Sequence, residues 1–137
     1  MTPAKRVGLR RILAFSAAAE AGTGIALMIA PSVVIPLLIR ESTTDLATWL
    51  GRFVGIALLS LGMACWPERH RSDVDTAAVR AMLAYNALVA LLLACIGAAG
   101  HIAGPLLWPA AVLHVAIALL LWMRRREARH TLRVEAT

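Results

Sequence analysis

ILAFSAAAEAGTGIALMIA, residues 12–30, decides the fold of this chain. Apart from Glu20 the run is uncharged, and as a helix it is long enough to cross a hydrocarbon core of about 30 Å. No water is present at that depth to solvate a carboxylate, so Glu20 must be protonated, paired, or turned towards a polar interior of a helix bundle. The run therefore predicts a transmembrane helix with an acidic residue near its centre.

Three further apolar runs, residues 47–66, 77–97 and 105–123, have a similar length. Each holds about 20 residues, which is the length of a helix that spans a bilayer. Of the 137 residues 60% are hydrophobic and 16% are charged, so the runs use most of the chain and leave no separate soluble domain. We expect one membrane domain over residues 1–137, an all-α integral membrane protein built as a bundle of four transmembrane helices.

Positive charge is unevenly shared among the segments that flank these runs. The first loop contributes only Arg40, and residues 98–104 contribute no basic residue. The other three flanks carry Lys5, Arg6, Arg10, Arg11, Arg69, Arg71, Arg124, Arg125, Arg126, Arg129 and Arg133. Because basic flanks stay on the cytoplasmic side, we expect an N-in, C-in, multi-pass protein of the inner membrane.

The net charge of +6 raises the question of a nucleic-acid partner. The basic residues flank the apolar runs instead of forming a stripe on a folded surface, so the lipid bilayer explains them better than nucleic acid does. Anionic lipid headgroups on the cytoplasmic face are the expected partners of the tail, residues 124–137. The arginines concerned are Arg124, Arg125, Arg126, Arg129 and Arg133.

The segment of residues 31–40 is apolar but is interrupted by Pro36. It is either an interfacial segment on the outer face or a kinked extension of the first span, and the interfacial alternative is favoured.

Small residues mark the faces on which the helices are expected to pack. In a bilayer helices associate through close contact and interhelical hydrogen bonds, so stripes of glycine and alanine indicate packing faces. Gly51, Gly55 and Gly62 share one face of the second run, and Gly24 lies close to Glu20 in the first. Packing within one bundle is the favoured role, and a face for homo-oligomer formation or for a membrane protein partner is the alternative.

Polar residues in all four runs are the candidate functional site. Glu20, Asn86 and His114 lie within one or two residues of the centres of their runs, so their depths should agree to roughly 2 Å. Arg52 lies about 7 Å nearer the outer side, from where its long side chain is expected to reach back towards Glu20. Tyr85, one residue from Asn86, is a further member.

Two roles are open for this midplane cluster. It is either a structural set, in which a Glu20–Arg52 pair fixes helix register, or a proton or ligand site with Glu20 titrating and His114 as the relay. No metal, haem or other cofactor is expected, because only His114 among the histidines lies inside a run and no third strong ligand is near Glu20. The sequence also lacks a catalytic motif, so an enzyme is the less favoured class.

Two family resemblances bear on function. The segment Arg52-Phe53-Val54-Gly55, followed by Leu58-Leu59-Ser60-Leu61-Gly62, resembles small four-span bacterial inner-membrane proteins of the DoxX-like kind, which implies an accessory subunit. The span count and a glutamate in the first span, within Ala19 to Thr23, are similar to the small multidrug resistance exporters, which implies proton-coupled export of cations. We expect a non-enzymatic accessory or assembly subunit, with a proton-coupled small-molecule transporter that uses Glu20 as the alternative.

Overall fold

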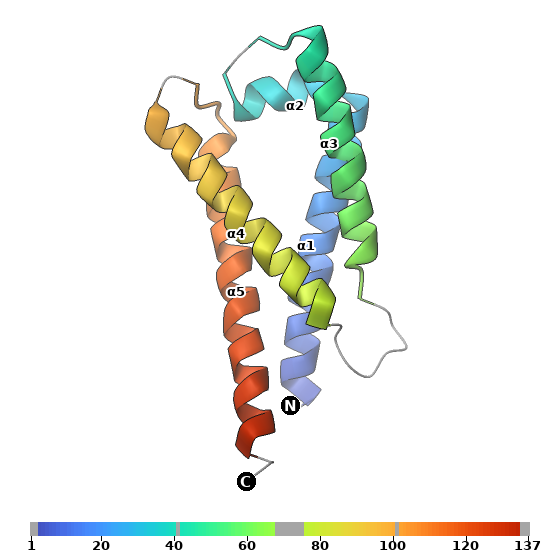
Figure 1. Cartoon of the computed structure of the whole chain (residues 1–137), viewed down its shortest axis with the longest axis vertical. Coiled ribbons are helices and arrows are strands. Elements are labelled where there is room, and N and C mark those ends of the chain that lie inside the picture. The colour runs from blue at the N-terminus through green and yellow to red at the C-terminus, as the bar shows by residue number, and fades with distance from the viewer. Residues whose placement is uncertain (1–2, 41, 68–75, 101, 135–137) are drawn as a thin grey trace.

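A computed structural model describes residues 3–40, 42–67, 76–100 and 102–134, and only the backbone for 3–5 and 128–134. This part of the chain is helical: α1 (Pro3–Ile29), α2 (Pro31–Leu38), α3 (Asp45–Ala64), α4 (Thr76–Ala99) and α5 (Leu107–Val134) (Figure 1). All but α2 contain an apolar stretch that is long enough to cross a membrane. The prediction of an all-α chain with four apolar spans is confirmed for the described residues.

Local sequence explains where the helices begin and end. The Thr44 hydroxyl accepts a hydrogen bond from the backbone N–H of Ala47 at 3.2 Å and so caps the start of α3. Gly100, with a φ of 83°, follows the end of α4 in the left-handed conformation that glycine adopts without strain. The last helix does not end at Met123, where the apolar run stops, but continues to Val134. The added segment is rich in arginine, which is a good helix former.

The segment after α1 forms a helix of its own. Ala30 leaves the helical region with φ −135° and ψ 57°, and Pro31 then occupies the first turn of α2. Figure 1 shows α2 lying across one end of the bundle, out of line with α1. The segment is therefore a separate helix, set off from α1 at Ala30, and its place at the membrane interface stays a prediction.

The long helices pack as two pairs, α1 with α3 and α4 with α5. The glycine face of α3 lies on α1: a Cβ atom at Gly55 would lie 2.6 Å from the carbonyl oxygen of Gly24, and one at Gly62 would lie 2.6 Å from that of Ala17. Gly51 instead contacts α2, where a Cβ atom would lie 3.0 Å from Ile35. The small residues therefore serve packing inside the chain, since any side chain would separate these backbones.

The two pairs meet at both ends of the bundle. At the end that holds the start of α1 and the end of α5, a core joins Leu13 of α1, Met82 of α4 and Leu121 of α5 with Cys65, the residue that follows α3. At the other end, backbone hydrogen bonds run from Gly104 to Leu38 at 2.9 Å and from Leu106 to Leu37 at 2.8 Å. The bundle is thus tied by side chains at one end and by the backbone at the other.

The outer faces of the four spans are strongly apolar. Between 22% and 33% of each apolar stretch is buried inside the protein. Large side chains such as Phe53, Leu88 and Val112 point outwards. This surface fits a multi-pass membrane protein, because lipid rather than water would surround it.

Candidate functional site: a buried polar cluster

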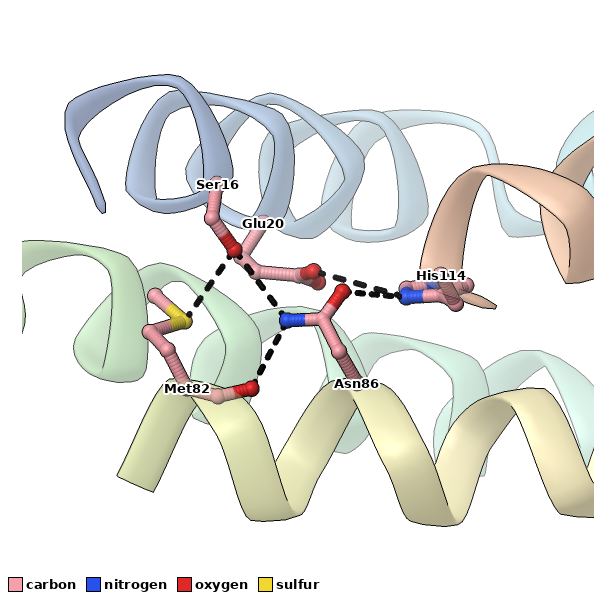
Figure 2. A network of polar contacts seen from close by, with 5 residues as sticks. All are labelled: Ser16, Glu20, Met82, Asn86 and His114. Atoms are coloured by element: carbon pink, nitrogen blue, oxygen red, sulfur yellow. Dashed lines mark hydrogen bonds and ion pairs between the residues drawn. The ribbon is translucent and has the colours of Figure 1, made fainter. Parts of the chain in front are cut away.

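A polar cluster lies between α1, α4 and α5, enclosed by the spans (Figure 2). Ser16 and Glu20 come from successive turns of α1, Met82 and Asn86 from successive turns of α4, and His114 from α5. Ser16 and Asn86 have no exposed surface, and Glu20 is 2% exposed. Polar groups buried to this degree require partners inside the protein.

A chain of hydrogen bonds satisfies most of these groups (Figure 2). The Asn86 amide donates from Nδ2 to the Met82 carbonyl oxygen at 2.9 Å and to Ser16 Oγ at 3.1 Å. The Ser16 hydroxyl donates to Met82 Sδ at 3.5 Å. At the other end of the amide, Asn86 Oδ1 lies 2.8 Å from Nδ1 of His114. Asn86 therefore joins all three helices.

Glu20 lies at the edge of this hydrogen-bond network, where its Oε1 is 3.9 Å from Nδ1 of His114. Tyr85 also contacts the histidine ring edge to face, with ring centroids 5.9 Å apart and an angle of 74° between the planes. Four of the residues predicted for the cluster do lie together, around His114: they are Glu20, Tyr85, Asn86 and His114 itself.

Arg52 is separate from the cluster, and the expected Glu20–Arg52 pair does not form. Its guanidinium group stacks on Trp49 at 5.1 Å from the ring centroid, and its buried Nε has no hydrogen-bond partner among the described residues. The packing of Gly55 on Gly24 sets Arg52 level with the last turn of α1, roughly 13 Å along the bundle from Glu20 at about 1.5 Å per residue. Arg52 therefore lies too far along the bundle to pair with the carboxyl group.

Sequence reasoning missed Ser16 and Met82 as members of the cluster. Ser16 precedes Glu20 by one helical turn, and Met82 precedes Asn86 by one turn. Residues four apart share a helix face, so the spacing of Ser16 identifies it as a neighbour of the acid. No such signal exists for Met82, because an apolar side chain inside a span is ordinary and its carbonyl oxygen is invisible in the sequence.

The cluster offers little to a metal ion. Within the described ranges, no group of three or more His, Cys, Asp or Glu side chains is placed to hold one. Within the described residues neither cysteine forms a disulfide; Cys65 is buried and Cys95 is exposed. The chemistry that the site can perform is proton binding and hydrogen bonding.

The basic residues gather at the end where α1 starts and α5 finishes. The Arg124 guanidinium lies over Gly8 of α1, where a Cβ atom would be 3.8 Å away, and Arg124 Nη1 is 3.5 Å from Glu127 Oε2. Arg126 stacks on Trp122 at 4.0 Å from its ring centroid. Arg125 is half-buried, and Arg129 and Arg133 lie in the last turns of α5 with side chains outside the described part.

Comparison with known proteins gives no match for this chain: no family model, no curated protein and no solved structure is similar to it.

Proposed function

We propose that this chain is a multi-pass inner-membrane protein, oriented N-in and C-in, in which Glu20 and His114 form a proton-binding site. The orientation is supported by the basic residues around the start of α1 and the end of α5, which lie at the same end of the bundle (Figure 1). Anionic lipid headgroups are the proposed partners of that end.

One observation carries the proton site: Glu20 is 2% exposed, and among the described residues its nearest cationic group is a histidine rather than an arginine. An arginine partner is charged at every physiological pH and would make the pair a fixed structural element. Histidine gains and loses its charge near neutral pH, so a Glu–His pair can change its net charge. The Glu20–Arg52 pair of the structural role is not formed, so any such role would rest on the hydrogen bonds of Asn86 and His114.

Proton-coupled transport of a small cation is the function that this pair supports best. With Glu20 ionised and His114 neutral the site carries one negative charge, which either a proton or a monovalent organic cation would balance. Exchange of one for the other keeps the site neutral and avoids the large free-energy cost of an unbalanced charge in hydrocarbon. Tyr85 and His114 would supply the aromatic surface that organic cations favour.

Proton release on ligand addition tests this function. Protein in weakly buffered detergent, with a pH indicator, is titrated with a panel of monovalent organic cations. We expect wild type to release protons and Glu20→Gln to release none, because the amide keeps the shape of the side chain but removes the negative charge that holds a proton at the site.

Glu127→Gln is the matched control, since it makes the same chemical change at a half-exposed acid near the end of α5. It should release protons as wild type does. Absence of release from wild type over the whole panel would reject the transporter.

An accessory or assembly subunit is the second candidate, and the extensive outward apolar surface favours it. Such a face serves equally for lipid, for a second copy of the chain or for a membrane protein partner. This function needs a stable bundle but no titrating site, so it predicts wild-type behaviour for a folded Glu20→Gln variant.

A further inference from the structure

The orientation of the Asn86 amide is fixed by its surroundings. A backbone carbonyl oxygen can only accept a hydrogen bond, so the amide atom 2.9 Å from the Met82 carbonyl oxygen must be the donor Nδ2. The same nitrogen gives its second hydrogen to Ser16 Oγ at 3.1 Å, whose own hydrogen points to Met82 Sδ. Turning the amide over would place two oxygen atoms against each other, so Oδ1 must face His114.

This orientation determines which nitrogen of His114 carries the proton. Asn86 Oδ1 is an acceptor, and it lies 2.8 Å from His114 Nδ1. A neutral histidine has one donor and one acceptor nitrogen, and the hydrogen bond that one nitrogen makes decides the tautomer. Only Nδ1–H satisfies the contact, which leaves the lone pair on Nε2.

We infer that Asn86 is a positioning residue: it holds neutral His114 in the Nδ1–H tautomer, so that Nε2 is the atom at which the site accepts a proton. The tautomer follows from the contacts alone, whereas proton uptake at Nε2 rests on the proposed function. The ionisable groups that face the ring are Glu20 from α1 and Tyr85 from α4.

Proton uptake at Nε2 requires no described hydrogen bond to break. Nδ1 already donates to Asn86, and it continues to do so when the ring becomes an imidazolium ion. The new charge lies beside the Glu20 carboxylate, 3.9 Å from Nδ1. The chain from Met82 through Ser16 and Asn86 to His114 is the same in both states, so the site gains its proton without repacking three helices.

Nitrogen-15 NMR of labelled histidine in lipid vesicles tests the tautomer directly. Replacing His70, His101 and His130 by Gln leaves His114 as the only histidine of the four. At alkaline pH, where the ring is neutral, we expect a hydrogen coupled to Nδ1 and the downfield shift of an unprotonated nitrogen for Nε2. A spectrum with the hydrogen on Nε2 would overturn the inference.

Variants in the same background separate positioning from a general structural role. Asn86→Leu removes the acceptor, so at least half of the signal should move to the Nε2–H tautomer. Ser16→Ala is the matched control: the Met82 carbonyl oxygen still orients the amide, and the wild-type spectrum should persist. If Asn86→Leu kept a pure Nδ1–H form, a group other than Asn86 would be fixing the tautomer.

Glu20→Gln covers the case in which Asn86→Leu does not fold. The hydrogen bond from Nδ1 to Asn86 is shorter than the contact with Glu20, so the tautomer should survive this change. Its loss would show that Glu20, and not Asn86, positions the ring. A wild-type protein with the Nδ1–H tautomer but without proton release would keep the role of Asn86 in fixing the tautomer and would reject both the transporter and proton uptake at Nε2.

Discussion

Glu20 Oε1 lies 3.9 Å from His114 Nδ1 while Arg52 stacks on Trp49 elsewhere in the bundle. Removing one partner of a buried ion pair costs about 3–5 kcal/mol, because the other charge is left uncompensated. Glu20→Gln leaves no arginine unpaired and keeps a hydrogen-bonding side chain beside His114. We therefore expect a loss of less than about 1.5 kcal/mol in the free energy of unfolding, measured by denaturation in detergent. A loss of about 3 kcal/mol or more would indicate a fixed ion pair.

The contact between α1 and α3 predicts a contrast between two glycines of α1. A Cβ atom at Gly24 would lie 2.6 Å from the Gly55 carbonyl oxygen, whereas one at Gly22 would have no neighbour within 4 Å. Gly24→Ala should destabilise the protein by about 1–3 kcal/mol, the usual range for overpacking. Gly22→Ala should be neutral or stabilising by up to about 1 kcal/mol, since alanine is the better helix former. Equal effects of the two changes on unfolding in detergent would contradict this packing.

Arg52→Gln tests the separation of the arginine from the acidic site. Because Arg52 lies roughly 13 Å along the bundle from Glu20, its removal should leave proton release unchanged. The assay is the indicator titration described for Glu20→Gln, with folding checked by gel filtration in the same detergent. Loss of release from a folded Arg52→Gln protein would mean that the two groups are coupled.

Membrane orientation is open to a labelling experiment. In a chain with Cys65 and Cys95 replaced by Ala, a single cysteine introduced at Ile102 should react with an impermeant reagent from outside the cell. A cysteine at Glu127, near the basic end, should react only after the membrane is opened. Labelling in the reverse order would show that the basic end faces outwards.

The backbone connection between the two helix pairs depends on Gly104. Its N–H donates to the Leu38 carbonyl oxygen at 2.9 Å, and a Cβ atom there would overlap the carbonyl group of Leu37. Gly104→Ala should therefore break this connection, and the amide hydrogens of residues 104 and 106 should exchange faster, roughly tenfold for each 1.4 kcal/mol lost. Gly100→Ala changes the same loop without a close neighbour, although it strains a positive φ. It should leave the exchange at residues 104 and 106 near the wild-type rate.

The fold followed from the sequence because hydrophobic length is a strong signal in a membrane protein. The predicted span 77–97 lies within α4, which runs one or two residues further at each end, whereas α1 begins nine residues before the predicted span 12–30 and ends at Ile29. Helix packing was also accessible, since the glycine faces of α1 and α3 can be seen at helical spacing. The continuation of α5 to Val134 was not expected, because a loss of hydrophobicity ends the apolar stretch without ending the helix.

The members of the site are harder to predict than the fold, because the midpoint of an apolar run gives only an approximate position of each residue along the bundle. Counting from the middle of each run put Arg52 within reach of Glu20, but α3 is displaced along α1 by the fit of Gly55 against Gly24. That displacement arises from side-chain volume at one contact, which a hydropathy pattern does not contain. Asn86 and His114 do lie at a common level, as predicted from the midpoints of their runs, because Asn86 Oδ1 is 2.8 Å from His114 Nδ1.

The division of the cluster between the two helix pairs has a consequence for biogenesis. Glu20 belongs to the first pair, whereas Tyr85, Asn86 and His114 all belong to the second. Because the ribosome delivers the N-terminal half first, α1 enters the lipid before any of these partners has been synthesised. We expect the acid to enter the membrane in its neutral, protonated form, because an ionised carboxylate would oppose insertion by several kcal/mol. The site would be complete only when α5, which carries His114, has been synthesised. A chain truncated before residue 114 should therefore insert its first half with Glu20 still protonated.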